Sequence, residues 1–346
     1  MKVYGAGIIG CGKIAKSHVE AILELPNLQL TAISDKDKMV LHDYVEQYQC
    51  QGYLDYKELL KNPQIDLICV CTPSGLHASM VIDALTADKH VLIEKPMALS
   101  LREADKIIAT AQRMNKKVAV IHPLRFNPPI LELKRAIDSG YFGELTHSSV
   151  IMQLNRDDNY YRQAAWRGTW KLDGGCLMNQ GIHGIDLLQW LLGPVESVFG
   201  YTATKLRKIE TEDVGIALLK FRSGVLGLVE AATTIYPVNL DEKLSVFGEK
   251  GSVVLNGKGF NNKHTWRFAD GIGLASKERE TTDYIGHKAI LHDFVVAIER
   301  NLQPSVDCYE GRKALEIVLA IYHSAKMKTE IRLPLEEQFV MGVGTL

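Results

Sequence analysis

The chain has 346 residues, of which 46% are hydrophobic and 23% charged, and its formal net charge is -1 at pH 7. This length predicts two globular domains, and the near-neutral charge gives no electrostatic basis for binding nucleic acids or membranes. No apolar run reaches the ~20 residues of a membrane span, and Met1-Lys2 leads straight into the first predicted strand, so we expect no signal peptide. Six cysteines without C-x-x-C spacing indicate free thiols in a reducing compartment, so we expect a cytoplasmic protein.

The first third of the chain alternates short apolar runs with helical patterns. Residues 65–72 form a continuous apolar run, which is typical of a parallel strand buried on both faces. Strands that alternate with helices imply right-handed crossovers and a doubly wound parallel sheet. The predicted strands are 2–9, 28–34, 65–72, 90–96 and 117–123, and the predicted helices are 14–25, 36–48, 56–62, 77–87 and 101–114.

Beyond residue 123 the pattern changes to longer strands separated by turn residues. Ser223-Gly224 predicts a hairpin turn between two of them. We therefore expect an α/β protein with a Rossmann domain over residues 1–123. An α+β domain with a large, open, mostly antiparallel sheet is expected over residues 124–346. Its predicted strands are 147–155, 195–206, 213–221, 225–235, 242–247, 252–256 and 330–334, and its predicted helices are 130–139, 177–192, 287–300 and 309–326.

The N-terminal stretch VYGAGIIGCGKIAKSH contains two overlapping glycine fingerprints. Gly5, Gly7 and Gly10 spell G-x-G-x-x-G, whereas Gly10, Gly12 and Ala15 spell G-x-G-x-x-A. The first leaves too short a strand before the turn and places two glycines within it, where glycine weakens pairing. In the second, Gly10 makes the turn, Gly12 lets the backbone approach a pyrophosphate and Ala15 allows close helix packing. We expect the second register.

A dinucleotide cofactor follows from this register. The helix after the turn would point its free N–H groups at a pyrophosphate. Asp35 ends the next predicted strand about 20 residues beyond the fingerprint, where a carboxylate bonds a ribose hydroxyl. This carboxylate favours NAD over NADP because it would repel a 2′-phosphate, although Ser34 and Lys36 could each hold one. The turn residues expected to contact the cofactor are Gly10, Cys11, Gly12, Lys13 and Ile14.

Two later strands end in groups suited to chemistry. Thr72-Pro73 follows the buried run 65–72, and Glu94-Lys95-Pro96 ends the next strand. Ligands of open α/β sheets bind at such carboxyl ends. A lysine there can hydrogen-bond a substrate hydroxyl and ease the removal of its proton.

With the glycine fingerprint, these motifs resemble the Gfo/Idh/MocA oxidoreductases, and the resemblance runs over essentially the whole chain. It implies a two-domain, NAD(P)-dependent enzyme that acts on sugars, cyclitols or sugar nucleotides. It also implies that Lys95 is catalytic and contacts both cofactor and substrate. Further cofactor contacts are implied at Thr72, Pro73, His77 and Glu94.

The second half of the family signature lies in DGGCLMNQGIHGID, residues 173–186. By the resemblance, His183 occupies the position of the catalytic histidine and Asp186 that of a later acid. An unperturbed imidazole titrates near pH ~6.5, so His183 suits the role of base, and Lys95 would stabilise the developing alkoxide. Asn179 stands where many members have an aspartate, which departs from a simple inositol or glucose dehydrogenase.

Asn179, together with RFNP (125–128) and WRGTW (166–170), resembles the branch that oxidises the 3-hydroxyl of UDP-N-acetylglucosamine or its uronic acid. Arginine binds phosphate or carboxylate, and an aromatic face suits a sugar or base. We expect cofactor contacts from Arg125, Trp166 and Arg167, and substrate contacts from Lys95, Arg156, Tyr161, Asn179, His183 and Tyr284. His287, close to Tyr284 in the chain, is expected near the same sugar.

Three alternatives remain open at this point. The chain could be an inositol or free-sugar dehydrogenase, an NAD-dependent glycosidase of the same fold, or a cofactor-sensing regulator. Lys95 and His183 argue against the regulator, which needs neither. The histidines show no metal-ligand spacing, so no metal is expected. An open sheet face predicts a homodimer or homotetramer.

Overall fold

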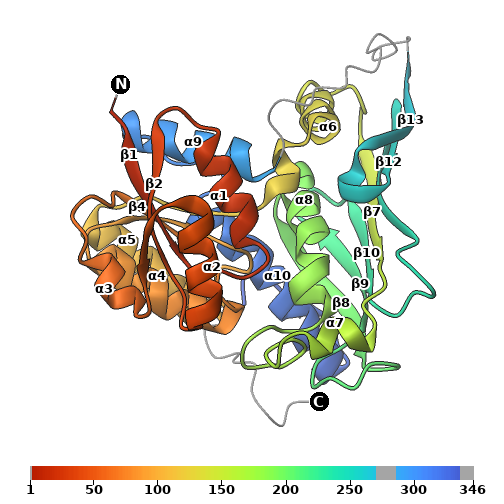
Figure 1. Cartoon of the computed structure of the whole chain (residues 1–346). Helices are drawn as coiled ribbons and strands as arrows, with labels where there is room; N and C mark the ends of the chain where they lie inside the picture. Colours follow the sequence, from red (N-terminus) through yellow and green to blue (C-terminus); the bar gives the residue numbers. More distant parts are fainter. Residues whose placement is uncertain (1, 270–285, 336–346) are drawn as a thin grey trace. The chain divides into compact units, whose positions relative to one another are not determined.

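The computed structural model describes residues 2–269 and 286–335 of the chain (Figure 1). The chain divides into two compact units. The first comprises residues 1–123 and 285–312, and the second comprises residues 124–284 and 313–346.

The helix α9 (His287–Glu299) belongs to the first unit, although it lies far beyond residue 123 in the sequence. It packs against α1 (Ala15–Leu23) and buries Phe294 among other apolar side chains. An amphipathic helix lies where its apolar face is covered. The second domain expected over 124–346 therefore lacks this segment, which completes the first unit instead.

A six-stranded parallel sheet forms the core of the first unit, in the order β3-β2-β1-β4-β5-β6. This sheet confirms the doubly wound arrangement predicted from the alternating strands and helices. The strand order reverses between β1 and β4, which is where open α/β sheets bind ligands. The strands are β1 (Tyr4–Ile9), β2 (Leu28–Ser34), β3 (Gln51–Tyr53), β4 (Leu67–Val70), β5 (His90–Ile93) and β6 (Val118–Val120); the other helices are α2 (Lys38–Tyr48), α3 (Tyr56–Leu60), α4 (His77–Thr86) and α5 (Leu101–Met114).

The glycine register is the one expected from the sequence. Gly5 and Gly7 lie inside β1. A Cβ atom on Gly5 would lie 1.8 Å from the Gln64 carbonyl oxygen, and one on Gly7 would lie 2.8 Å from Ile68 Cδ1. These two glycines are therefore packing residues of a buried strand. The chain turns after them at Gly10, whose φ is +94°.

An eight-stranded sheet dominates the second unit, in the order β13-β12-β11-β7-β10-β9-β8-β14. Among the described strands of this sheet, only β7 and β10 pair in parallel, so the predicted, mostly antiparallel sheet is confirmed. The strands are β7 (Leu145–Gln153), β8 (Val195–Ala203), β9 (Val214–Phe221), β10 (Leu226–Ala232), β11 (Asp241–Gly248), β12 (Gly251–Asn256), β13 (Asn262–Phe268) and β14 (Ile331–Arg332); the helices are α6 (Pro128–Asp138), α7 (Asp158–Arg162), α8 (Ile182–Leu192) and the greater part of α10 (Cys308–Met327).

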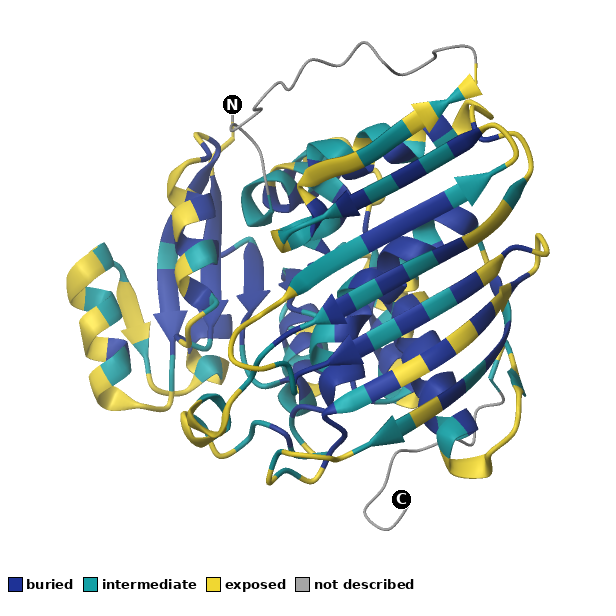
Figure 2. Ribbon diagram, turned by 90° about the vertical axis from the view of Figure 1, so that its right-hand side faces the viewer, coloured by how far each residue is buried: buried dark blue, intermediate teal, exposed yellow. Residues whose placement is uncertain are grey.

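Helices cover one face of this sheet and leave the other open (Figure 2). On the covered face, α8 lies so close to β7 that a Cβ on Gly184 would approach Val150 Cγ2 to 2.3 Å. The helix α10 lies equally close to β8, where an added Cβ on Gly200 would approach Ile321 Cγ2 to 2.8 Å. Along β9, exposed residues that face the open side alternate with buried residues that face the helices, as a sheet with one covered side requires.

Two edge strands, β3 and β13, do not appear in the prediction from sequence. Neither contains a residue that is fully buried, so neither shows the apolar alternation that marks a strand. The predicted Ser223-Gly224 turn is confirmed between β9 and β10. Gly224 has a φ of +90° and donates its N–H to the Phe221 carbonyl at 2.9 Å.

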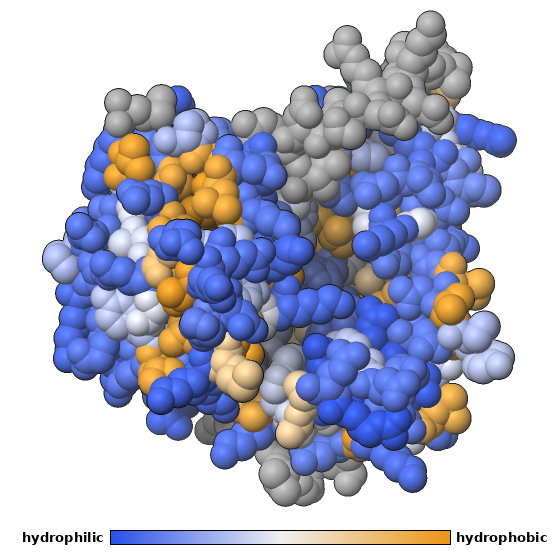
Figure 3. Space-filling model, in the orientation of Figure 1, coloured by the Kyte–Doolittle hydropathy of each residue, from blue (hydrophilic) through white to orange (hydrophobic). Residues whose placement is uncertain are grey.

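None of the described helices is both long and apolar enough to cross a membrane. Hydrophilic residues predominate on the face shown in Figure 3, and the apolar residues there form small separate areas. This agrees with the ordinary composition of the chain.

Candidate active site

The turn after β1 is closely packed at Gly10 and open at Gly12. At Gly10 a Cβ atom would lie 2.9 Å from Thr72 Cγ2, at the end of β4. At Gly12, by contrast, an added Cβ would meet no described atom within 4 Å. The helix α1 then begins without a side-chain cap, so no side chain accepts its first N–H groups. Such a turn can receive an anionic group on its backbone N–H groups.

Asp35 links the end of β2 to this turn. Its Oδ2 accepts the Cys11 N–H at 2.7 Å and its Oδ1 accepts the Asp37 N–H at 2.9 Å. Both oxygens retain a lone pair for a ribose hydroxyl. Burial raises the pKa of the Cys11 thiol to about 12, which keeps it un-ionised at neutral pH. Of the other predicted turn residues, Lys13 is exposed and Ile14 directly precedes α1.

The predicted residues after β4 and β5 meet at the same sheet edge. His77 is 1% exposed, and its ring nitrogens lie 2.8 Å from the carbonyl oxygens of Thr72 and Pro96. The imidazole therefore joins two strand ends inside the unit. Lys95, directly before Pro96, is only partly buried, and Pro73 leads the chain from Thr72 toward α4.

Glu94 is buried and holds two imidazoles. His18 Nε2 lies 2.9 Å and His287 Nε2 lies 3.0 Å from its Oε1. Burial alone would raise the pKa of Glu94, but the hydrogen bonds from the two histidines bring it well below its usual range. The Glu94 carboxylate is thus ionised, and its Oε1 is hydrogen-bonded to two histidines of the first unit. His287, expected near the sugar, faces Glu94.

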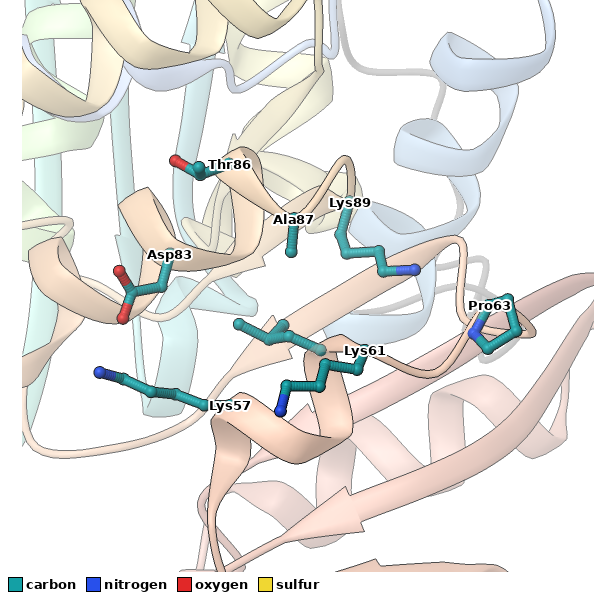
Figure 4. A pocket seen from close by; sticks show the side chains of 8 residues that line it. Lys57, Lys61, Pro63, Asp83, Thr86, Ala87 and Lys89 are labelled. Carbon is teal, nitrogen blue, oxygen red and sulfur yellow. The ribbon is translucent and has the colours of Figure 1, made fainter.

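A pocket lies at the opposite edge of the parallel sheet (Figure 4). Its volume is about 690 Å³, and it is lined by Lys57, Leu60, Lys61, Pro63, Asp83, Thr86, Ala87 and Lys89. Pro63 precedes β4 and Lys89 precedes β5, so the pocket faces the amino ends of these strands. Lys89 Nζ donates to the carbonyl oxygens of Asn62 at 3.0 Å and Ile65 at 2.8 Å. The Lys89 ammonium group is therefore hydrogen-bonded to backbone carbonyl groups. The pocket also lies away from the glycine turn.

In the second unit, arginines stack on aromatic rings. The Arg167 guanidinium lies 4.1 Å from the Tyr160 ring centroid and 4.9 Å from that of Trp166. The Arg156 guanidinium lies 5.4 Å from the Tyr160 ring and donates to Gln180 Oε1 at 3.4 Å. We refer to Arg156, Tyr160, Trp166 and Arg167 as the arginine–aromatic stack. It combines flat apolar faces with two cations that suit phosphate or carboxylate.

A small polar pocket lies beside this stack. Its volume is about 10 Å³, close to that of one water molecule, so it marks a polar lining and not a substrate-sized cavity. The Tyr161 hydroxyl reaches Thr233 Oγ1 at 3.2 Å. The pocket is lined by Arg156, Tyr160, Tyr161, Asp173, Gly174, Gly175, Cys176, Asn179, Gln180, Thr211 and Thr233. The structure therefore brings together three of the predicted substrate residues, Arg156, Tyr161 and Asn179.

A buried carboxylate accounts for the asparagine at position 179. Asp173 is 2% exposed, and its Oδ2 accepts the Gly168 N–H at 2.7 Å. Its Oδ1 accepts a hydrogen bond from Asn179 Nδ2. The other end of that amide accepts from Gln180 Nε2 at 2.9 Å. Because Asp173 Oδ1 is the acceptor of this contact, position 179 needs a donor, which asparagine supplies and an ionised aspartate does not.

Asn179→Asp would place a second carboxyl group against Asp173. Two adjacent carboxyls share a proton and one acquires a raised pKa. The variant should therefore lose stability relative to the wild type as the pH rises through that pKa. Urea unfolding from pH 5 to 8 should show a deficit of about 1–3 kcal/mol that develops toward pH 8.

The exchange variant Asp173→Asn/Asn179→Asp is the matched control. It restores one donor and one acceptor at this contact, so its unfolding free energy at pH 8 should lie closer to the wild type than that of Asn179→Asp. Equal stability of Asn179→Asp and wild type across this pH range would contradict the assigned pairing.

His183 lies on α8, which a buried ion pair holds in place. Arg125 Nε donates to Asp186 Oδ2 at 2.8 Å and its Nη2 donates to Oδ1 at 2.6 Å. Both side chains are at most 3% exposed. Asp186 follows His183 by nearly one helical turn, so the pair fixes the rotation of the helix that carries His183. The Arg125 guanidinium, expected at the cofactor, makes its described contacts here.

A π-helical turn, η3 (Leu177–Gly181), precedes α8 and carries Asn179. Glu212 lies beneath it. Its Oε1 accepts the Leu177 N–H and the Tyr322 hydroxyl, both at 2.8 Å, and a Cβ on Gly175 would lie 1.7 Å from its Oε2. Burial raises the pKa of Glu212 to about 7 against these hydrogen bonds. Short π-helical turns are frequent at functional sites, and Glu212 supports this one.

The raised pKa of Glu212 makes stability depend on pH. Between about pH 4.5 and 7 the native carboxyl keeps a proton that the unfolded chain releases, so wild-type stability should fall as the pH rises through this window. Each pH unit there costs up to about 1.4 kcal/mol. Glu212→Gln removes the titrating group, so its stability relative to the wild type should increase over the same window.

Urea unfolding of both proteins at pH 5, 6, 7 and 8 measures this difference. Glu210→Gln, an exposed carboxyl nearby, is the control and should follow the wild type. A difference between Glu212→Gln and wild type that is constant with pH would contradict the assigned titration.

Sequence reasoning assigned no role to three buried groups. They are His18 in the first unit, and Asp173 and Glu212 in the second. A signal existed only for His18, a polar residue on the apolar face of α1 beside Ala15 and Val19. Tyr284, expected at the substrate, lies outside the described residues.

Comparisons with known proteins match both units. The profile of the Gfo/Idh/MocA oxidoreductase family with an NAD-binding Rossmann fold matches residues 4–122, and that of the Gfo/Idh/MocA C-terminal domain matches residues 130–254. The WlbA dehydrogenase of Bordetella pertussis, solved with NADH and UDP-GlcNAcA, is 33% identical with a TM-score of 0.90, over 97% of this chain and 99% of its own. The WlbA dehydrogenase of Chromobacterium violaceum, solved with the same ligands, is 34% identical with a TM-score of 0.90, over 97% of each chain. The myo-inositol 2-dehydrogenase of Thermotoga maritima is 26% identical over 94% of this chain and 98% of its own.

Proposed function

The chain belongs to the Gfo/Idh/MocA oxidoreductase family, and from this premise we propose that it oxidises the 3-hydroxyl of a UDP-linked N-acetyl amino sugar with NAD. It is an NAD(P)-dependent oxidoreductase with a Rossmann domain. The observation that carries the finer proposal is the arginine–aromatic stack beside Asn179. The likeness to two dehydrogenases solved with UDP-GlcNAcA supports it.

The residues of the glycine turn fit a dinucleotide. The open space at Gly12 and the uncapped start of α1 would receive the pyrophosphate, and Asp35 would bond the ribose hydroxyls. When bound, the nicotinamide accepts the hydride that leaves the sugar carbon. Thr72, Pro73 and Lys95 lie at the carboxyl ends of the neighbouring strands, where the cofactor of an open α/β sheet binds.

Oxidation of a secondary alcohol removes a hydride from carbon and a proton from oxygen, which leaves a ketone. We assign the proton to the imidazole of His183. Lys95 would donate a hydrogen bond to the alcohol oxygen and stabilise its developing negative charge. Asn179, whose amide is oriented by Asp173, would contact the sugar.

The arginine–aromatic stack suits an anionic nucleotide sugar better than a neutral ring. A UDP-linked uronic acid carries a diphosphate and a carboxylate, both of which bind a guanidinium. Its uracil and sugar rings both present faces that pack on aromatic side chains. The two arginines, Arg156 and Arg167, have no evident use for an uncharged inositol.

A panel of UDP-sugars, free sugars and inositols tests the function through NADH absorbance. We expect NADH to form from UDP-N-acetylglucosamine or its uronic acid and not from the uncharged sugars. Lys95→Ala and His183→Ala should each lower turnover at least about a hundredfold and leave NAD binding largely intact.

Each other outcome points to a different protein. A response to inositol alone would favour an inositol dehydrogenase. Cleavage of a glycoside without net NADH would favour the glycosidase mechanism. Near-full activity of either variant would remove that residue from the mechanism.

The choice of NAD over NADP is assigned to the Asp35 carboxylate. Asp35→Asn keeps an oxygen for the Cys11 N–H and removes the charge that repels a 2′-phosphate. It should weaken NAD binding and lower the ratio of Kd for NADP to Kd for NAD by about tenfold, or about 1.4 kcal/mol. Fluorescence titration with each cofactor measures this ratio.

The control for this change is Asp37→Asn, which alters an exposed carboxylate two residues away and keeps a helix-capping side chain. Its ratio should equal that of the wild type. An equal loss of affinity for both cofactors in Asp35→Asn would exclude Asp35 as the discriminating group.

We also propose that the chain forms a homodimer or homotetramer through the open face of the eight-stranded sheet. Three adjacent strands of this face, β8, β9 and β10, carry exposed large apolar residues, namely Tyr201, Ile216, Leu218 and Leu226. An apolar area of this kind is usually covered in an assembly.

All six cysteines are free thiols, which supports a cytoplasmic location.

A further inference from the structure

The residue before Lys95 is held by histidines from two helices. An ionised carboxylate only accepts hydrogen bonds, so Glu94 Oε1 receives the Nε2–H of His18 at 2.9 Å and that of His287 at 3.0 Å. His18 lies on α1, directly after the glycine turn, and His287 is the first residue of α9. The two rings meet edge to face, with 4.9 Å between centroids. Movement of Glu94 would break both hydrogen bonds.

The residue after Lys95 is held by a third histidine. The ring nitrogens of His77 lie 2.8 Å from the carbonyl oxygens of Pro96 and Thr72, and the neutral imidazole has one N–H to donate to either of them. It therefore links the end of β5, which carries Lys95, to the end of β4. We call His18, His77 and His287 the histidine frame.

The atoms around Glu94 also lie within 4.8 Å of one another, as the ligands of a metal ion do. A metal-bound imidazole carries its proton on the other nitrogen, which then needs an acceptor. His18 Nδ1 is buried, and no described residue hydrogen-bonds to it. When Nε2 carries the proton and donates it to Glu94, Nδ1 is unprotonated and needs no acceptor. The geometry favours a hydrogen-bonded clamp over a metal site.

We propose that the histidine frame is a positioning device, which holds the backbone of Lys95 so that its ammonium group meets the substrate oxygen. The inference rests on the proposed function, because it uses the role assigned there to Lys95. The three histidines act through Glu94 and Pro96. A displacement of about 1 Å can cost about a hundredfold in rate, so loss of one clamp should appear in turnover.

His287 offers the sharpest test because its side chain is 19% exposed and tolerates replacement better than its fully buried partners. His287→Ala should lower kcat about tenfold to a hundredfold and leave the KM for the sugar nucleotide and the Kd for NAD within about threefold of wild type. The primary deuterium isotope effect on kcat should rise, because hydride transfer becomes slower relative to product release.

Two further variants control this result. His287→Gln keeps an N–H donor for Glu94 and should recover most of the lost kcat. His292→Ala changes an exposed histidine on the same helix and should match the wild type. His77→Gln, measured in the same way, tests the clamp on Pro96 and should show the same rise in isotope effect.

Labelling of Lys95 separates this inference from the proposed function because it needs no substrate. Trinitrobenzenesulfonate modifies amines, and mass spectrometry gives the rate at Lys95 as a function of pH. This profile should change in His287→Ala and not in His292→Ala. If the wild type oxidises none of the sugars and the profile still changes, the proposed function fails and the frame stands.

Two outcomes would overturn the frame itself. The first is an active wild type whose kcat, isotope effect and Lys95 labelling are all matched by His287→Ala. The second is stoichiometric binding of Zn²⁺ in calorimetry by the wild type and not by Glu94→Gln, because the cluster would then be a metal site.

Discussion

The first unit depends on one edge of its parallel sheet, where short contacts tie neighbouring strand ends together. Asp35 joins the end of β2 to the glycine turn after β1. His77 joins the ends of β4 and β5, and Glu94 after β5 returns to α1 through His18. Parallel strands place all these ends on one side, so short side chains suffice to link them. The position of Lys95 therefore follows from the backbone of the whole edge and not from one loop.

The second unit buries three carboxyl groups around the start of α8, those of Asp173, Asp186 and Glu212. An ionised group in the interior needs partners, or its pKa shifts. Asp186 has the guanidinium of Arg125, and Asp173 has a backbone N–H and the amide of Asn179. Glu212 accepts hydrogen bonds from the Leu177 N–H and the Tyr322 hydroxyl, and its burial raises its pKa to about 7. The three solutions fix the π-helical turn and the helix that carry the proposed substrate residues.

Most of the fold could be predicted because its signals are local. Apolar runs and helical spacing identify the two sheets, and the length of the strand needed before the glycine turn identifies the register. The edge strands β3 and β13 left no such signal because they bury little. The site is harder because its partners are distant in the chain: Glu94 contacts His18 across 76 positions and His287 across 193. A motif shows that Glu94 and Lys95 matter but not which residues hold them, and that comes only from the folded chain.

The same limit applies to the departure from the family pattern at Asn179. Taken alone, an amide in place of a carboxylate suggests a different substrate. In the structure the amide donates to Asp173, six positions earlier, and a carboxylate there would face another carboxylate. The identity of residue 179 is thus set by its neighbour as well as by any ligand. The substrate class is therefore better argued from Arg156 and Arg167, whose guanidinium groups lie on aromatic faces and suit an anionic ligand.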